Sequence, residues 1–141
     1  MQSLLGIWTL LFVNYTANPA EVPYYGPQAV GRIIITESHF SATITDLNRT
    51  TPLPPDQRWR TAADDVVAQN ARPMVAYAGP YRLEEREGGE VLTHTDVKVS
   101  LNPSWQGTDQ VRMVECKEFE GREVLSLWPI NVSLLWICLC C

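Results

Sequence analysis

Basic side chains are scarce and scattered in this sequence. Of its 141 residues, 11 are Lys or Arg and 16 are Asp or Glu, so the formal net charge is −5. The densest basic group is Arg58 with Arg60, whereas proteins that bind nucleic acid need clustered cations to neutralise phosphates. We therefore do not expect binding to nucleic acid or to an anionic membrane surface.

Cysteine and histidine are too few and too poorly spaced for a disulfide framework or a metal site. Three of the four cysteines lie in the last four residues, where they close almost no loop, and the fourth is Cys116. His39 and His94 are far from them in sequence, so no zinc-type spacing arises. The sequence also lacks a phosphate-binding loop and a Ser-His-Asp order. We expect neither a metal nor a cofactor.

Neither apolar end has the features of an export signal or a membrane span. Residues 4–13 are apolar, but the first basic residue of the chain is Arg32, so a first strand is favoured over a signal peptide. The apolar run 132–139 is much shorter than the roughly 20 residues that a span needs. We expect a cytoplasmic protein. Residues 129–141 form a final strand, carry a prenyl group on Cys138, or are an aberrant tail.

Most of the chain has the alternation and turn residues of an antiparallel sheet. Trp8, Leu10 and Phe12 are predicted to share one face of the first strand. A hairpin is predicted around Glu37 and Ser38. Further strands are predicted at 81–85, 91–101, 109–116, 124–128 and 132–138, with a tight turn at Gly88-Gly89.

One segment near the middle breaks the strand pattern. Thr61 and Asp64 have the spacing of a capping box, and Val67 and Asn70 recur at helical spacing. Pro73 should kink or end that helix near Asn70, with one more turn possible up to residue 77. The sequence therefore predicts a mainly β protein: a single domain over 1–141, built as a closed or nearly closed antiparallel barrel of about eight strands with one inserted helix. Such a barrel has room for one small ligand.

Four stretches have a more specific character. Gly6 and Trp8 form a Gly-x-Trp opening, and residues 24–36, 76–81 and 102–112 contain motifs in a fixed order. Together they resemble the small lipocalin-like domain family of bacteria and filamentous fungi, over about residues 4–127. The matching signature positions are Gly26, Gly31, Tyr77, Gly79, Tyr81, Trp105, Gly107, Asp109, Gln110 and Arg112. The chain departs from the family after Pro129, where members usually have a longer loop.

The resemblance implies a barrel, with a helix closing one mouth, that binds or transforms a small organic molecule. Fungal members often belong to natural-product pathways, in which such barrels act as isomerases or cyclases. Our first hypothesis is a cofactor-independent cyclase or isomerase for a hydrophobic secondary-metabolite intermediate. The second is a non-catalytic carrier for a similar ligand. The oligomeric state is not predicted.

Proton transfer is assigned first to His94, because imidazole titrates near neutrality. Asp96 would share its strand face and could orient the ring. The same alternation also allows His94 to lie on the outer face beside Lys98. For Arg112, binding of an enolate or carboxylate competes with stacking on Trp8.

The remaining candidates are polar or aromatic residues near the expected mouth of the barrel. Asp109 is a possible base. Tyrosines line pockets with their rings and polarise carbonyls with their hydroxyls, and a loop tryptophan can act as a lid or as a plug. The predicted catalytic residues are His94, Asp109 and Arg112, and the predicted ligand-binding residues are Tyr24, Tyr77, Tyr81, Trp105 and Gln110. Convergence of His94, a tyrosine and Arg112 would favour the enzyme, and a wholly apolar lining would favour the carrier.

Overall fold

The computed structural model of this chain describes residues 4–15, 28–130 and 135–140, which fold mainly as β strands. The strands are β1 (Gly6–Tyr15), β2 (Ala29–Ile35), β3 (His39–Asp46), β4 (Met74–Arg86), β5 (Gly89–His94), β6 (Val99–Ser100), β7 (Gln110–Phe119), β8 (Arg122–Pro129) and β9 (Leu135–Cys140). The helical elements are η1 (Leu47–Arg49), η2 (Trp59–Thr61), α1 (Asp64–Ala71) and η3 (Pro103–Trp105).

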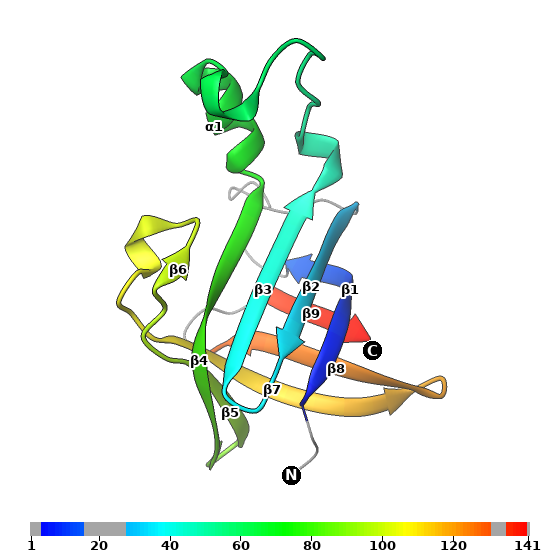
Figure 1. Cartoon of the computed structure of the whole chain (residues 1–141). Helices are drawn as coiled ribbons and strands as arrows, with labels where there is room; N and C mark the ends of the chain where they lie inside the picture. The colour runs from blue at the N-terminus through cyan, green and yellow to red at the C-terminus, as the bar shows by residue number, and fades with distance from the viewer. Residues whose placement is uncertain (1–3, 16–27, 131–134, 141) are drawn as a thin grey trace.

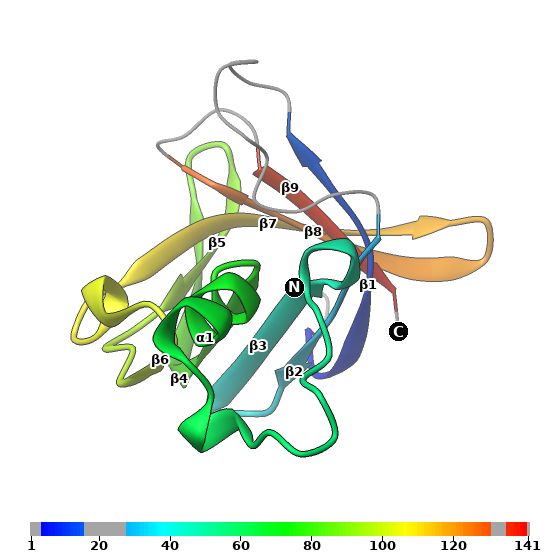
Figure 2. The same cartoon turned by 90° about the horizontal axis from the view of Figure 1, so that it is seen from above.

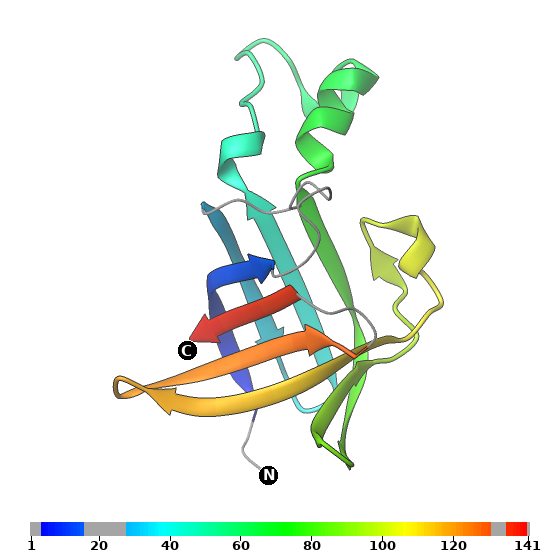
Figure 3. The same cartoon turned by 180° about the vertical axis from the view of Figure 1, so that it is seen from behind.

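In the described part of the chain, all strands but β6 form a closed antiparallel ring. The hydrogen-bonded order is β3-β2-β1-β9-β8-β7-β5-β4, and β4 returns to β3. The length of β4 makes this closure possible, because residues 74–80 pair with β3 and residues 81–86 pair with β5. Figure 1 shows β2, β3 and β4 side by side as one wall, and Figure 3 shows β7, β8 and β9 crossing the other. The predicted mainly β barrel is confirmed.

The core follows from strand pairing, because residues that face each other across neighbouring antiparallel strands point to the same side of the sheet. Trp8 is paired with Ile33, Ile33 with Ala42, and Ala42 with Tyr77. All four are buried in one hydrophobic cluster. Full burial of a large apolar side chain contributes roughly 1.5–3 kcal/mol, so this row across four strands is a main source of the fold's stability.

Phe12 lies outside this core, so the prediction that it shares a face with Trp8 and Leu10 is wrong. The register between β1 and β9 shifts between Leu10 and Phe12, as in a β-bulge. An extra residue at a bulge reverses the alternation that follows it. Trp8 and Leu10 are therefore buried, whereas half of Phe12 is exposed.

The inserted helix ends close to Asn70, as predicted, at Ala71, but it has no capping box. Ala63 is the N-cap of α1 and makes no side-chain capping bond, and the Thr61 hydroxyl donates instead to the carbonyl of Arg58. Asp64 and Asp65 in the first turn favour this helix start electrostatically. The chain enters β4 directly after Pro73, so no further turn reaches Tyr77. Of the helices described, none combines the length and the apolar character needed to cross a membrane.

The strand predicted over 91–101 ends at His94. Asp96 has a φ of 44°, a left-handed conformation that a strand cannot contain. Residues 95–109, which we call the covering segment, fold against β4 at the place where β5 has stopped. The Thr95 amide donates to the carbonyl of Pro80 at 2.9 Å, and the Leu101 amide donates to that of Ala76 at 2.8 Å. The buried Val97 joins the core cluster.

The C-terminal residues complete the ring. Strand β9 pairs with β1 on one side and with β8 on the other, which confirms the final strand predicted there. Residues 132–134 of that prediction lie outside the described residues. Without β9, β1 and β8 would each have an unpaired edge.

Deletion of residues 131–141 should therefore produce aggregation. The exposed edges of β1 and β8 would pair with other molecules, because unpaired amides and carbonyls template strand addition. Size-exclusion chromatography of the truncated and full-length chains measures the effect. A chain that lacks only Cys141 is the control, and it should remain as dispersed as the full chain. A truncated chain that stays dispersed and equally heat-stable would show that β9 is dispensable.

Gly31 is expected to tolerate no side chain. A Cβ atom there would lie 2.6 Å from the backbone oxygen of Thr43 and 2.8 Å from Cγ1 of Ile44, so β2 and β3 would have to separate. Overpacking of this kind typically costs about 1–3 kcal/mol. Urea denaturation of Gly31→Ala should show a loss in that range. Gly79→Ala is the matched control, since its Cβ would lie 3.4 Å from the nearest atom, the Thr95 oxygen, and should cost much less. Equal losses would contradict the argument.

Candidate functional site

Four aromatic rings meet inside the barrel, and we call them the aromatic cluster. They belong to Phe40 on β3, Tyr77 on β4, His94 on β5 and Trp105 in η3. The rings of Phe40 and His94 are stacked, with centroids 3.7 Å apart and planes 17° apart. Tyr77 lies 5.2 Å from His94, and Trp105 meets Tyr77 edge to face at 5.1 Å. The covering segment, which contains Trp105, thus covers the aromatic side chains that β3, β4 and β5 contribute.

His94 is fully buried, and neither of its ring nitrogens has a hydrogen-bond partner among the residues that the structure describes. The alternative that placed it on the outer face is therefore wrong. Asp96 does not orient the ring either, because its carboxylate lies 3.2 Å from the Lys98 ammonium at the surface. An unpaired buried polar atom costs about 1–3 kcal/mol, so two of them in one ring require an explanation.

The environment of His94 keeps its imidazole neutral. Burial is the main cause and the positive charge of Arg112 is the second, and together they lower the pKa of His94 to about 3. A neutral imidazole offers one lone pair and one N–H, so it can accept a proton from a ligand and hydrogen-bond to it at the same time.

Tyr77 and Arg112 form the polar side of the same region. Arg112 is paired with the buried Leu92 across the β5–β7 ladder, so its side chain belongs to the inner face. Its guanidinium lies near enough to the Tyr77 hydroxyl to lower the pKa of that hydroxyl through charge and hydrogen bonding, and its Nη1 donates to the carbonyl of Val111 at 2.9 Å. Burial raises the pKa of Tyr77 above its ordinary value of 10.0, while the charge and the hydrogen bond of Arg112 oppose that rise. The structure therefore brings His94, Tyr77 and Arg112 together.

Asp109 and Gln110 have structural contacts outside the cluster. The Asp109 carboxylate accepts a hydrogen bond from the Asp96 amide at 3.0 Å and lies 3.9 Å from Nη2 of Arg82. It thus ties the two ends of the covering segment together at an exposed position. Gln110 donates from Nε2 to the Thr108 hydroxyl at 2.9 Å. On the backbone, Gln110 is nevertheless the cross-strand partner of His94 in the β5–β7 ladder. The catalytic role of Asp109 and the ligand-binding role of Gln110 stay predictions.

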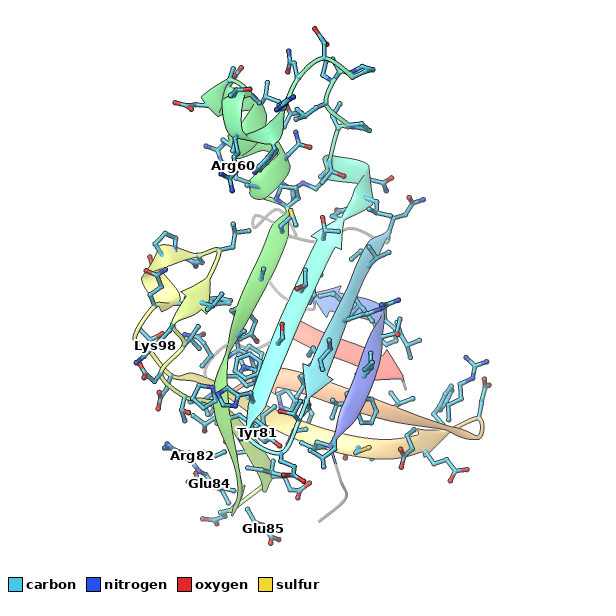
Figure 4. All side chains as sticks on the ribbon, in the orientation of Figure 1. Arg60, Tyr81, Arg82, Glu84, Glu85 and Lys98 are labelled. Carbon is cyan, nitrogen blue, oxygen red and sulfur yellow. The ribbon has the colours of Figure 1, made fainter. Side chains whose placement is uncertain are left out.

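Of the tyrosines predicted to bind the ligand, Tyr77 belongs to the aromatic cluster, whereas Tyr81 has its contacts elsewhere. The Tyr81 hydroxyl donates to the carbonyl of Thr36 at 2.9 Å, which ties β4 to the β2–β3 turn. Burial and the charge of Glu37 both raise the pKa of Tyr81. Figure 4 shows Tyr81 near that turn, with Arg82 and residues 84–85 projecting outward below it. Tyr24 lies outside the described residues. The predicted stacking of Arg112 on Trp8 stays a prediction.

Phe40 is the site residue that sequence reasoning missed. In the sequence it is one apolar residue of an alternating strand, with Ala42 and Ile44 on the same face. Its position over His94 depends on the β3–β4 register, which pairs Phe40 with Gly79. No local pattern predicts that register, so the alternation could have identified Phe40 only as a core residue.

Two surface hollows of about 520 Å³ each lie away from the aromatic cluster. One is bounded by Thr50, Leu53, Trp59 and Met74. Figure 2 shows α1 and β4, the elements on either side of it, from above. The other lies over the outer face of β1, β2 and β3. Neither includes a residue of the cluster, so a ligand reaches His94 only if a covering side chain moves. Trp105 is the half-buried ring of the cluster and therefore the one best placed to move.

Comparison with protein families agrees with this architecture. A family model described as a lipocalin-like domain matches residues 5–136. The chain belongs to this family. Neither the curated proteins nor the solved structures contain a match to it. The lipocalin-like barrel, closed by eight strands, is of a size suited to one small hydrophobic ligand.

Because His94 is buried in its neutral form, we predict that this lipocalin-like domain is sensitive to acid. Its pKa is about 3 in the folded protein, against an ordinary value of 6.5. Below pH 6.5 the unfolded chain takes up a proton that the folded chain does not, so the free energy of unfolding falls as the pH falls toward 3. From pH 7 to pH 5, this one group should remove about 2 kcal/mol. Urea titrations at the two pH values measure the loss.

The variants that isolate this effect differ at the two histidines. His94→Gln removes the titrating group from the folded and the unfolded states. Between pH 7 and pH 5, the free energy of unfolding of this variant should therefore fall by about 2 kcal/mol less than that of the wild type. His39→Gln should keep the whole loss, because His39 is exposed and hydrogen-bonded to Ser38 at 2.8 Å. The same pH dependence in His94→Gln as in the wild type would contradict a buried neutral His94.

Proposed function

We propose that this lipocalin-like barrel binds a hydrophobic carbonyl compound and acts on it as a cofactor-independent isomerase or cyclase. The observation that carries the proposal is the meeting of His94, Tyr77 and Arg112 at one place in the barrel, with both nitrogens of His94 unpartnered. A polar ligand atom at this place would supply the missing hydrogen bond. From its membership of the lipocalin-like family, we further propose that the substrate is a secondary-metabolite intermediate, and we propose a cytoplasmic location.

His94 is the proposed base. It takes a proton from the carbon next to the carbonyl, so that a C–H bond breaks, an N–H bond forms and the electron pair moves to the carbonyl oxygen. Arg112 and the Tyr77 hydroxyl bind the resulting enolate oxygen. In an isomerase the imidazolium then returns the proton to another carbon. In a cyclase the enolate carbon attacks a second carbonyl carbon of the same molecule. A C–C bond forms, the π bond of that carbonyl breaks, and the resulting alkoxide oxygen takes the proton from the imidazolium.

Arg112 has opposite effects on His94 before and after proton transfer. Before the transfer its charge opposes an imidazolium and helps to keep the pKa of His94 near 3. Once an enolate lies beside Arg112, the two charges largely cancel, and the imidazolium is also stabilised by the enolate. The basicity of His94 therefore rises only while a substrate is being ionised, which suits a base that must remain neutral at rest.

A carrier without chemistry is the second candidate. The low pKa of His94 favours it, because so weak a base is of little use unless the substrate itself raises that pKa. In a carrier, His94 and Arg112 would hold a carbonyl oxygen in place, and the aromatic cluster would supply apolar contact. The two candidates differ in whether a C–H bond of the ligand is broken.

Proton exchange on a bound ketone distinguishes them. The bicyclic ketone 2-tetralone has acidic protons beside its carbonyl, and their replacement by deuterium in D2O is followed by proton NMR. We expect the protein to accelerate the exchange, and His94→Gln to lower that acceleration by about 10²-fold or more, as for loss of a catalytic base. Binding is measured separately, by quenching of tryptophan fluorescence.

His39→Gln is the matched control and should exchange 2-tetralone like the wild type, because His39 lies at the surface. Equal exchange by His94→Gln and the wild type would remove His94 as the base. Binding without acceleration by the wild type would instead support the carrier.

A further inference from the structure

Arg112 is a cation on the inner face of the barrel, and none of the carboxylates in the described ranges forms an ion pair with it. It is only partly exposed, and its neighbour on β5, Leu92, is fully buried. Its described hydrogen bonds go to two uncharged oxygens, the Val111 carbonyl and the Tyr77 hydroxyl. The positive charge is strong enough at the cluster to contribute to the low pKa of His94.

Two exposed arginines near the same end of the barrel, Arg82 and Arg86, have a carboxylate partner. Nε of Arg82 lies 3.2 Å from Oε1 of Glu84, and Nη2 of Arg86 lies 2.7 Å from Oε2 of the same Glu84. A cation that loses water without gaining a counter-ion is destabilised by several kcal/mol. Arg82 and Arg86 are thus paired where water already screens their charge, whereas Arg112 has no partner among the described carboxylates at a place where a bound ligand would exclude water.

We infer that the ligand of this barrel is a planar organic anion, such as a phenolate or the enolate of a 1,3-dicarbonyl compound, whose ionised oxygen is bound by Arg112 and Tyr77. The inference rests on the proposed function and adds the charge and the shape of the ligand. A guanidinium has five N–H donors in a plane, so Arg112 can keep its described bonds and still donate to an oxyanion.

His94 adds a further donor for such an anion. Its imidazole is neutral, so one of its two unpartnered nitrogens carries a proton and can donate to an ionised oxygen. A ligand with no ionised oxygen would leave Arg112 uncompensated while displacing the water around it. The site should therefore bind the anion more tightly than a neutral molecule of the same size.

The aromatic cluster favours a flat ligand. The rings of Phe40 and His94 are 3.7 Å apart, which is the separation of stacked rings. A planar π system that took the place of the Trp105 ring could stack on the rings of the cluster in the same way. Trp105 is half-buried and meets Tyr77 edge to face. Its displacement would open a flat space, the size of an aromatic side chain, beside Tyr77 and His94.

A pair of probes that are nearly equal in size but differ in charge tests the inference. The probe 4-nitrophenol is used at a pH where it is ionised, and 4-nitroanisole has nearly the same size but cannot ionise. Tryptophan quenching gives both dissociation constants, and the visible absorption of nitrophenolate reports its binding directly. We expect the phenolate to bind at least about tenfold more tightly, since hydrogen bonds to a charged group contribute roughly 1.5–3 kcal/mol.

Variants of Arg112 assign the selectivity. Arg112→Met should lower nitrophenolate affinity about tenfold or more and change nitroanisole affinity little. Arg112→Lys keeps the charge and should retain most of the preference, which also shows that the position accepts substitution in a folded protein. Arg82→Met, at the surface, is the matched control and should bind both probes like the wild type.

Three results would overturn the inference. Equal affinity of the wild type for the two probes would show that charge is not selected, although the barrel would still bind hydrophobic molecules as proposed. Failure of both probes to bind would overturn it as well, and exchange of 2-tetralone would then decide separately on the proposed function. Loss of the phenolate preference in Arg82→Met would assign the effect to surface charge.

Discussion

The ladder between β3 and β4 determines both the closure of the barrel and the composition of the site. It turns an open sheet into a ring, and its register pairs Phe40 with Gly79 and Ala42 with Tyr77. A shift of one residue would move every inward side chain of one strand to the outside. Phe40 would then lose its contact with His94, and Tyr77 would lose its place beside Arg112. Fold and site therefore depend on the same hydrogen bonds.

The buried imidazole is the point where this protein departs from the rule that interior polar atoms are paired. The hydroxyl of the neighbouring Thr93 is also buried without a partner. Departures of this kind lower stability, and in natural proteins they concentrate where function requires them. Here the stacking of Phe40 on one face of the imidazole holds a ring that no hydrogen bond orients. The ring is fixed in position while its nitrogens remain available.

Much of the fold could be predicted from the sequence, because hairpins and alternation are local signals. The β2–β3 and β4–β5 hairpins follow from their turn residues. The errors arose where local patterns permit two outcomes. Alternation in β5 defines two faces but does not say which is inside, and residues 91–94 are buried on both faces. The bulge at Phe12 and the left-handed Asp96 are backbone irregularities that residue type alone does not reveal.

For the site, sequence reasoning found the residues but not their grouping. His94, Tyr77 and Arg112 come from three strands, and only the closed ring makes them neighbours. Asp109 has the chemistry of a base, yet its carboxylate is used to fasten a turn. Residue type therefore indicates what a side chain can do, whereas the register decides whether it has anything to act on.

The covering segment is bonded largely to itself. The Val97 amide donates to the Thr108 carbonyl, and the Gly107 amide donates back to the Val97 carbonyl. Only a few hydrogen bonds join it to β4, and none of the ladders that close the ring passes through it. Exchanges of exposed side chains in this segment can thus occur without disturbing the barrel. One scaffold can in this way acquire new ligand preferences by changing the loop that carries Trp105, while the strands beneath it stay the same.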